Sequence, residues 1–181
     1  MSADAASIVE VALIDKLDEP RGYCLDIVGS QRKATPERGL QAHTCYSYQG
    51  AIAVDQGFDR ELIRKGEFRL PTFRVCMTLQ SVKQGSPLAL ETCDGRTEQT
   101  FELNSAGRIA PRSDATLCLT VAGGAGVPGG GGRPTHLIRK LTVERCGAER
   151  ATYQTWQMRE RTEYQSDMKA NMTRSIVIGK I

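Results

Sequence analysis

The chain has 181 residues, which is most simply one domain that is long enough to bury a core. Its net charge of +3 is too small to indicate nucleic-acid binding, and no basic run is interleaved with aromatic residues. No apolar stretch reaches the roughly 20 residues that a membrane-spanning helix needs. The sequence therefore predicts neither a nucleic-acid partner nor membrane insertion.

Short segments rich in β-branched residues follow one another along the chain and predict strands. In chain order they span residues 8–14, 22–28, 40–46, 51–54, 74–79, 88–92, 100–103, 116–121, 137–143 and 155–158. Polar stretches and stretches that contain glycine or proline separate them and predict turns. Short strands with regular turns favour an all-β sandwich or barrel.

Three of these strands carry a cysteine at the same place, and each is followed by a second cysteine and then by a Gln-x-aromatic triplet. The strands are Tyr23-Cys24-Leu25-Asp26-Ile27, Val75-Cys76-Met77-Thr78-Leu79 and Leu117-Cys118-Leu119-Thr120-Val121. The second cysteines are Cys45, Cys93 and Cys146, and the triplets are Gln56-Gly57-Phe58, Gln99-Thr100-Phe101 and Gln154-Thr155-Trp156. A pattern that recurs every 40 to 50 residues or so predicts a repeated fold, here a pseudo-threefold barrel.

The repeats divide the chain into one domain over residues 1–160 and an extension over residues 161–181. We place the first, second and third repeats at about 20–66, 67–110 and 111–160. The apolar end of the extension, residues 175–181, is expected to be a last strand that pairs with the N-terminal strand and closes the barrel. Residues 123–132 contain seven glycines but lack the Lys-Ser/Thr of a phosphate-binding loop, so they predict a flexible insertion in the third repeat.

Six cysteines in three evenly placed pairs indicate disulfides, which persist outside the cytosol. The N-terminus lacks the features of a signal peptide. We therefore expect a secreted or periplasmic protein that has lost its leader or was cut from a larger chain. A cytosolic protein with six free thiols is the alternative. No Cys-x-x-Cys occurs, so the sequence predicts no metal site and no cofactor.

These motifs resemble the ricin B-chain type of β-trefoil lectin domain, in which Cys-Leu-Asp opens each repeat and Gln-x-Trp closes it. The likeness covers roughly residues 20–160. Among the fifteen possible pairings of six cysteines, the resemblance implies one disulfide within each repeat. The implied bridges are Cys24–Cys45, Cys76–Cys93 and Cys118–Cys146, each expected to stabilise the fold by about 3 kcal/mol. It also implies that Phe58, Phe101 and Trp156 fill the core, beside glutamines that bond the local backbone.

The resemblance further implies a sugar site in the first repeat. A carboxylate accepts hydrogen bonds from adjacent sugar hydroxyls, and a flat side chain covers the apolar face of the ring. Asp26 is the expected acceptor, Gln41 a polar contact and His43 the stacking side chain. Asp55 takes the place where the family usually has asparagine, and Gln56 beside it is the fifth residue of the expected sugar-binding set. Two further tyrosines, Tyr46 and Tyr48, are alternative stacking platforms.

The second and third repeats have lost this pattern, because threonine replaces the carboxylate and glutamate replaces the stacking residue in both. The replacing residues are Thr78, Ala89 and Glu91 in the second repeat and Thr120, Thr142 and Glu144 in the third. One competent site is therefore expected. Two alternatives stay open: Asp26 caps the turn after its strand, and His43 is a plain surface residue.

The resemblance implies a non-catalytic lectin domain that binds galactose or N-acetylgalactosamine on glycans. No nucleophile has a plausible base, and the two histidines, His43 and His136, lie in no catalytic motif. Two alternatives remain. One is a trefoil that binds proteins, with decayed sugar sites. The other is a glycan-targeting domain of a larger secreted enzyme or toxin. The sequence leaves the oligomeric state open.

Overall fold

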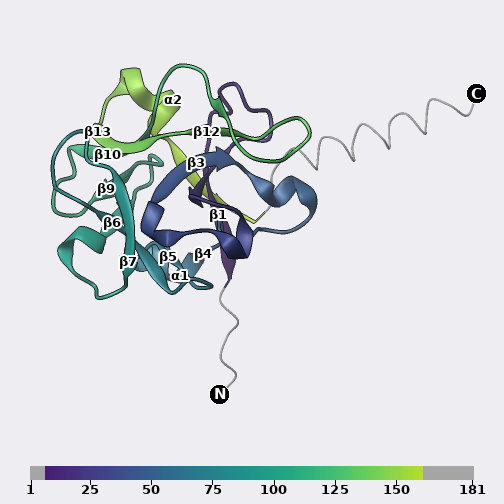
Figure 1. Cartoon of the computed structure of the whole chain (residues 1–181). Coiled ribbons are helices and arrows are strands. Elements are labelled where there is room, and N and C mark those ends of the chain that lie inside the picture. The colour runs from purple at the N-terminus through teal and green to yellow at the C-terminus, as the bar shows by residue number, and fades with distance from the viewer. Residues whose placement is uncertain (1–6, 161–181) are drawn as a thin grey trace, which may run out of the picture.

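The computed structural model describes residues 7–160, and its architecture is the all-β fold that the sequence predicts (Figure 1). Two short α-helices, α1 (Arg60–Lys65) and α2 (Ala151–Gln154), accompany the strands. The strands of this range are β1 (Ile8–Leu13), β2 (Tyr23–Ile27), β3 (Leu40–Thr44), β4 (Phe58–Asp59), β5 (Arg69–Leu70), β6 (Val75–Leu79), β7 (Leu88–Thr92), β8 (Phe101–Leu103), β9 (Ile109–Pro111), β10 (Leu117–Val121), β11 (Val127–Pro128), β12 (Leu137–Arg139), β13 (Leu141–Arg145) and β14 (Trp156–Arg159).

Three antiparallel hairpins repeat one pattern of pairing. They join β2 to β3, β6 to β7 and β10 to β13, with five residue pairs in each. The second residue of every first strand is the cysteine of the repeated motif. The fourth residue is Asp26 in β2, Thr78 in β6 and Thr120 in β10. The three positions that the sequence compares are thus equivalent in the structure.

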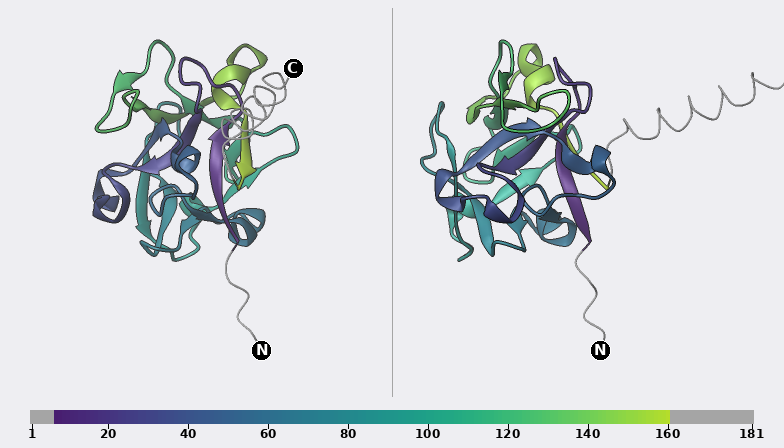
Figure 2. Two further views of the ribbon diagram at one scale, coloured as in Figure 1. Left: turned by 90° about the vertical axis from the view of Figure 1, so that its right-hand side faces the viewer. Right: turned by 45° about the vertical axis from the view of Figure 1, so that its right-hand side comes forward.

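The first and last described strands pair with each other. β1 runs antiparallel to β14, with Glu10 opposite Arg159 and Leu13 opposite Trp156 (Figure 2, left). On its other edge β1 pairs with β2 and β4. The strand expected over residues 175–181, and the extension that contains it, lie outside the described residues.

One core cluster contains the three closing aromatic residues of the repeats. Phe58, Phe101 and Trp156 are at most 1% exposed. The ring of Phe68 lies between two of them, in edge-to-face contact with Phe58 at 6.4 Å and with Phe101 at 6.0 Å. The indole N–H of Trp156 donates to the carbonyl of Leu119 in β10, so burial leaves this donor bonded.

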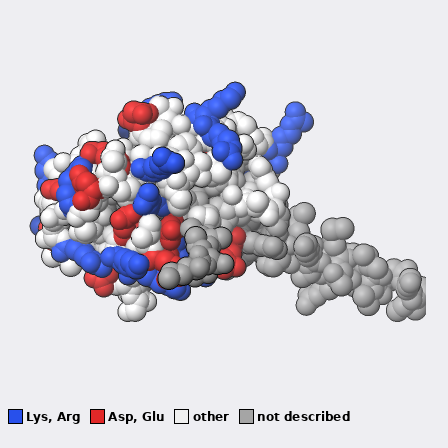
Figure 3. All heavy atoms as spheres, turned by 90° about the horizontal axis from the view of Figure 1, so that it is seen from below, with Lys and Arg blue, Asp and Glu red and all other residues white. Residues whose placement is uncertain are grey.

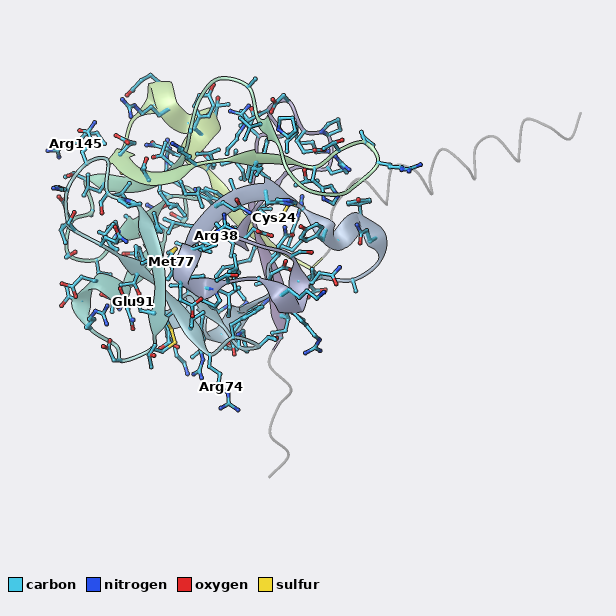
Figure 4. All side chains as sticks on the ribbon, in the orientation of Figure 1. Cys24, Arg38, Arg74, Met77, Glu91 and Arg145 are labelled. Carbon is cyan, nitrogen blue, oxygen red and sulfur yellow. A yellow bond between two sulfur atoms is a disulfide. The ribbon has the colours of Figure 1, made fainter. Side chains whose placement is uncertain are left out.

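All three predicted disulfides are present. Cys24–Cys45, Cys76–Cys93 and Cys118–Cys146 span Cα–Cα distances of 5.0, 5.1 and 5.1 Å. Each joins the first strand of a hairpin to the residue just after its second strand. Figure 4 labels Cys24 in the interior, whereas Arg74 and Arg145 extend outward.

Two predicted strands differ from the structure. Residues 51–54 form no strand; they lead into a turn in which the N–H of Gln56 bonds back to the carbonyl of Ala53. Residues 137–143 are divided at Lys140 into β12, which joins the first-repeat sheet, and β13, which pairs with β10. The pattern of apolar residues in the sequence also did not predict the helix α1. This helix begins where Asp59 accepts from the N–H groups of Glu61 and Leu62 and ends at Gly66.

The surface carries charges of both signs. On the face seen in Figure 3, basic and acidic side chains are interspersed over much of the surface. No helix in the described range is both long and apolar enough to cross a membrane.

Candidate functional site

The closing glutamine of the first repeat connects the two ends of that repeat. Gln56 is fully buried, and its Nε2 donates to Asp26 Oδ2 at 2.8 Å and to the carbonyl of Thr44 at 3.0 Å. Its Oε1 accepts from the N–H of Tyr46 at 2.9 Å. The amide therefore bonds at both ends, as the resemblance implied for a structural glutamine.

The other two repeats reproduce this bonding. Gln99 donates to Thr78 Oγ1 at 3.2 Å and to the carbonyl of Thr92 at 2.9 Å. Gln154 donates to Thr120 Oγ1 at 2.9 Å and to the carbonyl of Arg145 at 3.0 Å. The fourth position of the first hairpin strand is thus an acceptor for the glutamine in every repeat. Only in the first repeat is that acceptor a carboxyl group.

Asp26 lies below the surface. Its side chain is 0% exposed, and Gln41 Nε2 donates to its Oδ1 at 3.0 Å while Gln56 donates to Oδ2. Burial raises the pKa of Asp26 well above its ordinary value, and the charge of Asp55 raises it further; the two amide hydrogen bonds act in the opposite direction. Gln41, whose amide occupies Oδ1, is only half-buried.

Asp55 is equally buried and anchors a neighbouring loop. Its Oδ2 accepts from the N–H of Gln31, a residue with the left-handed φ of 48°. Its Oδ1 has no hydrogen-bond partner among the described residues. Burial raises the pKa of Asp55 as well. An asparagine, the residue expected here from the resemblance, keeps the acceptor for Gln31 without the charge.

His43 presents no free face for stacking. The side chain is 3% exposed, and its Nδ1 donates to the carbonyl of Thr44 at 2.9 Å. Its ring centroid lies 4.9 Å from that of Tyr46 and 5.2 Å from that of His136. Burial lowers the pKa of His43 to about 4. Asp26, Gln41, Asp55 and Gln56 thus form one cluster, and His43 belongs to an aromatic cluster beside it.

The third repeat supplies the cover over His43, which sequence reasoning missed. Strand β12 pairs with β3 at Ile138 opposite His43, and the two strands lie side by side in Figure 1. Tyr48 Oη lies 2.9 Å from His136 Nε2. A Cβ on Gly132 would lie 2.4 Å from the His136 ring, so this glycine lets the insertion close over it. Only the glycine content of residues 123–132 hinted at such a close approach.

An open hollow lies beside the carboxyl cluster. It has a volume of about 610 Å³ and runs between residues 30–33 and 51–54, with Tyr46 and Gln49 also in its lining. Tyr46 is close enough to Asp26 and Asp55 for their charges to add to the burial that raises its pKa. None of the five predicted sugar-binding side chains lines this hollow. Nothing in the sequence marked residues 30–33 as part of a binding site, because they are simply part of a polar loop.

A smaller hollow lies over the third repeat. Its volume is about 440 Å³, and Thr120, Thr142 and Glu144 line it together with Tyr153 and Arg150. Thr142 Oγ1 donates to Glu144 Oε1 at 2.9 Å, and Arg150 lies 3.6 Å from the same carboxylate group. The polar groups here are therefore largely paired with one another.

Comparison with known proteins agrees with this architecture. The model of the ricin-type β-trefoil lectin domain matches residues 16–129, more than half of the chain. The chain belongs to the ricin-type β-trefoil lectin family. No curated protein sequence matches it. The fold is therefore a β-trefoil, and the three hairpins are its main repeated elements.

Solved trefoil lectins resemble this family member at low sequence identity, so they bear on the fold. The Vibrio vulnificus hemolysin/cytolysin β-trefoil lectin, solved with N-acetyl-D-lactosamine bound, has a TM-score of 0.56 and 15% identity over 88% of this chain and 98% of its own. The earthworm R-type lectin C-half, in complex with GalNAc, has a TM-score of 0.54 and 14% identity over 84% of this chain and 98% of its own. Agglutinin from Abrus precatorius has a TM-score of 0.52 and 14% identity over 86% of this chain. The match spans about half (48%) of the agglutinin chain.

Proposed function

We propose that this chain is a non-catalytic lectin domain that binds galactose- or N-acetylgalactosamine-type sugars through one site in its first repeat. The observation that carries the proposal is the carboxyl group of Asp26 at a position where the other repeats have threonine, close to the larger hollow. The sugar-bound Vibrio and earthworm neighbours support glycans as the ligand class. Three disulfides support the proposal that the protein works outside the cytosol.

In this proposal Gln41 controls access to Asp26. A sugar hydroxyl reaches Asp26 Oδ1 by replacing the amide of Gln41, whose side chain is half-buried. One hydrogen bond is exchanged for another, so the net gain is small. A single shallow site of this kind is expected to bind in the millimolar to high micromolar range, roughly −4 to −6 kcal/mol.

The test is a glycan array with the oxidised protein beside Gln41→Ala and Asp26→Ala. We expect galactoside binding that weakens at least about tenfold in Asp26→Ala, which corresponds to about 1.4 kcal/mol. Gln41→Ala should bind as tightly as wild type or more tightly, because it removes the amide that the sugar displaces from Asp26. Thr78→Ala is the matched control, because it removes the equivalent acceptor from the second repeat. Near-ultraviolet circular dichroism checks the fold of Asp26→Ala, because loss of the carboxyl group leaves the amides of Gln41 and Gln56 without this acceptor. Binding that survives unchanged in a folded Asp26→Ala would place the site elsewhere.

The burial of Asp26 favours a second candidate function. A buried carboxyl group with both oxygens bonded inside the protein can serve the fold alone. The domain would then bind a protein partner or target a larger secreted chain, with its sugar sites decayed. A blank array for wild type, with the fold intact, is the outcome that favours this candidate.

A further inference from the structure

The larger hollow has an unbalanced charge. Of the described residues that line it, only Arg32 and Lys33 are charged, and both are exposed. Among the described residues neither makes an ion pair or a side-chain hydrogen bond, unlike Arg64 and Arg96, which bond to neighbouring carboxylates. Two cationic side chains are therefore available at the rim of the hollow.

The carboxyl groups nearby do little to cancel these charges. Asp26 and Asp55 lie beneath the surface and outside the lining. The pKa of each is raised by burial, so each favours its neutral form more than an exposed carboxyl group does. Asp55 instead fixes the rim, because its bond to the N–H of Gln31 holds the loop that carries Arg32 and Lys33.

The rest of the lining suits a sugar. Ser30, Gln31 and Gln49 offer hydroxyl and amide groups for sugar hydroxyls, and Ile52 and Val54 offer apolar contact. The volume of about 610 Å³ lies in the usual range of small-molecule sites, about 300–1,000 Å³. It is open to solvent, so a branch or substituent of a larger glycan can enter it.

We infer that the glycan bound at the first repeat carries an anionic group, a carboxylate or a sulfate, that Arg32 and Lys33 hold at the rim of this hollow. The inference rests on the proposed function, since it names the class of galactoside that the first-repeat site selects. Arginine and lysine bind such groups through charge-assisted hydrogen bonds that neutral sugars cannot make.

The test compares lactose, sialyllactose and sulfated lactose by titration calorimetry against wild type and the double variant Arg32→Ala/Lys33→Ala. We expect wild type to bind at least one anionic form about tenfold more tightly than lactose, with an affinity that falls as salt rises. The double variant should lose this preference and keep its affinity for lactose. Arg38→Ala/Lys83→Ala is the matched control, because it removes the same charge from exposed residues outside the hollow.

Each outcome bears on a different claim. Equal affinity for all three sugars, or an anionic preference that persists in the double variant, would overturn the inference and leave the proposed function standing. Binding to none of the three sugars by a folded wild type would overturn both. Different responses to sialyllactose and sulfated lactose tell which anionic group is the ligand.

Discussion

Asp26 and Asp55 place two carboxyl groups in one buried region of the first repeat. Burial and the charge of Asp55 raise the pKa of Asp26 well above its ordinary value. The unfolded chain releases this proton near pH 4, whereas the folded protein keeps it to higher pH. The folded state therefore binds more protons in this window, and stability falls as pH rises from about 4 through the raised pKa.

Replacing Asp55 by asparagine should reduce this loss of stability at high pH. Asp55→Asn keeps an acceptor for the N–H of Gln31, removes the charge beside Asp26 and gives the unpartnered Oδ1 position a donor. We expect a gain of about 1 kcal/mol at pH 8, or about 2–4 °C in melting temperature, and a smaller gain at pH 4. Differential scanning calorimetry at both pH values measures it, with the exposed Glu37→Gln as control. An equal shift at both pH values would contradict the electrostatic explanation.

At the scale of elements, strand β12 attaches the third repeat to the first. His43 in β3 and His136 just before β12 meet there in a buried aromatic cluster. Burial lowers the pKa of both imidazoles, that of His43 to about 4. The groups that face them include the buried pair of Glu19 and Arg21, whose charges act in opposite directions.

The buried imidazoles of His43 and His136 should make the protein less stable in mild acid. The unfolded histidines take up protons near pH 6.5, while the folded ones stay neutral to lower pH, so the unfolded state binds more protons between about pH 4 and 6.5. We expect stability to fall by about 2 kcal/mol from pH 7 to pH 5. Urea unfolding across this range measures the loss.

The variant His43→Gln/His136→Gln contains no histidine and isolates this effect. Its stability should no longer fall over the same range, because Asp26 and Asp55 act with the opposite sign. A loss in this variant as large as in wild type would assign the pH dependence to other groups.

The repeated motifs predicted the strands of the first two hairpins, and the first strand of the third, to within a residue or two at each end, because cysteine and alternating apolar side chains mark those strands. The second strand of the third hairpin was predicted over 137–143 and is β13 instead. The motifs did not predict that Asp26 and His43 are buried. That depends on which distant segment covers them, and His136 is 93 residues from His43 in sequence. Residues 51–54 are apolar enough for a strand, but they face a hollow instead of a neighbouring strand. The local sequence pattern predicts strands and helices, whereas tertiary contacts decide which distant segment covers a site.

At the scale of the whole molecule, the three disulfides differ in exposure. Cys146 is exposed and Cys93 is half-buried, whereas Cys24 and Cys45 are both 0% exposed. Thiol–disulfide exchange requires access of a thiolate to a sulfur atom. The bridge in the first repeat, next to the proposed site, is therefore the best protected.

Stepwise reduction should follow this order. With a low concentration of dithiothreitol, we expect Cys118–Cys146 to open first and Cys24–Cys45 last, as followed by alkylation and peptide mass spectrometry. Loss of a bridge should cost about 3 kcal/mol, or about 6–12 °C in melting temperature. Early alkylation of Cys24 in the still folded protein would contradict the order.

The pairing of β1 with β14 brings both ends of the folded domain to one place. Strand neighbours lie about 4.8 Å apart, and Glu10 stands opposite Arg159. A host protein could therefore receive this trefoil within a single surface loop, with short linkers and little distortion. For the same reason, a circular permutant that joins these ends and opens at the turn between β8 and β9 should keep all three hairpins and their disulfides.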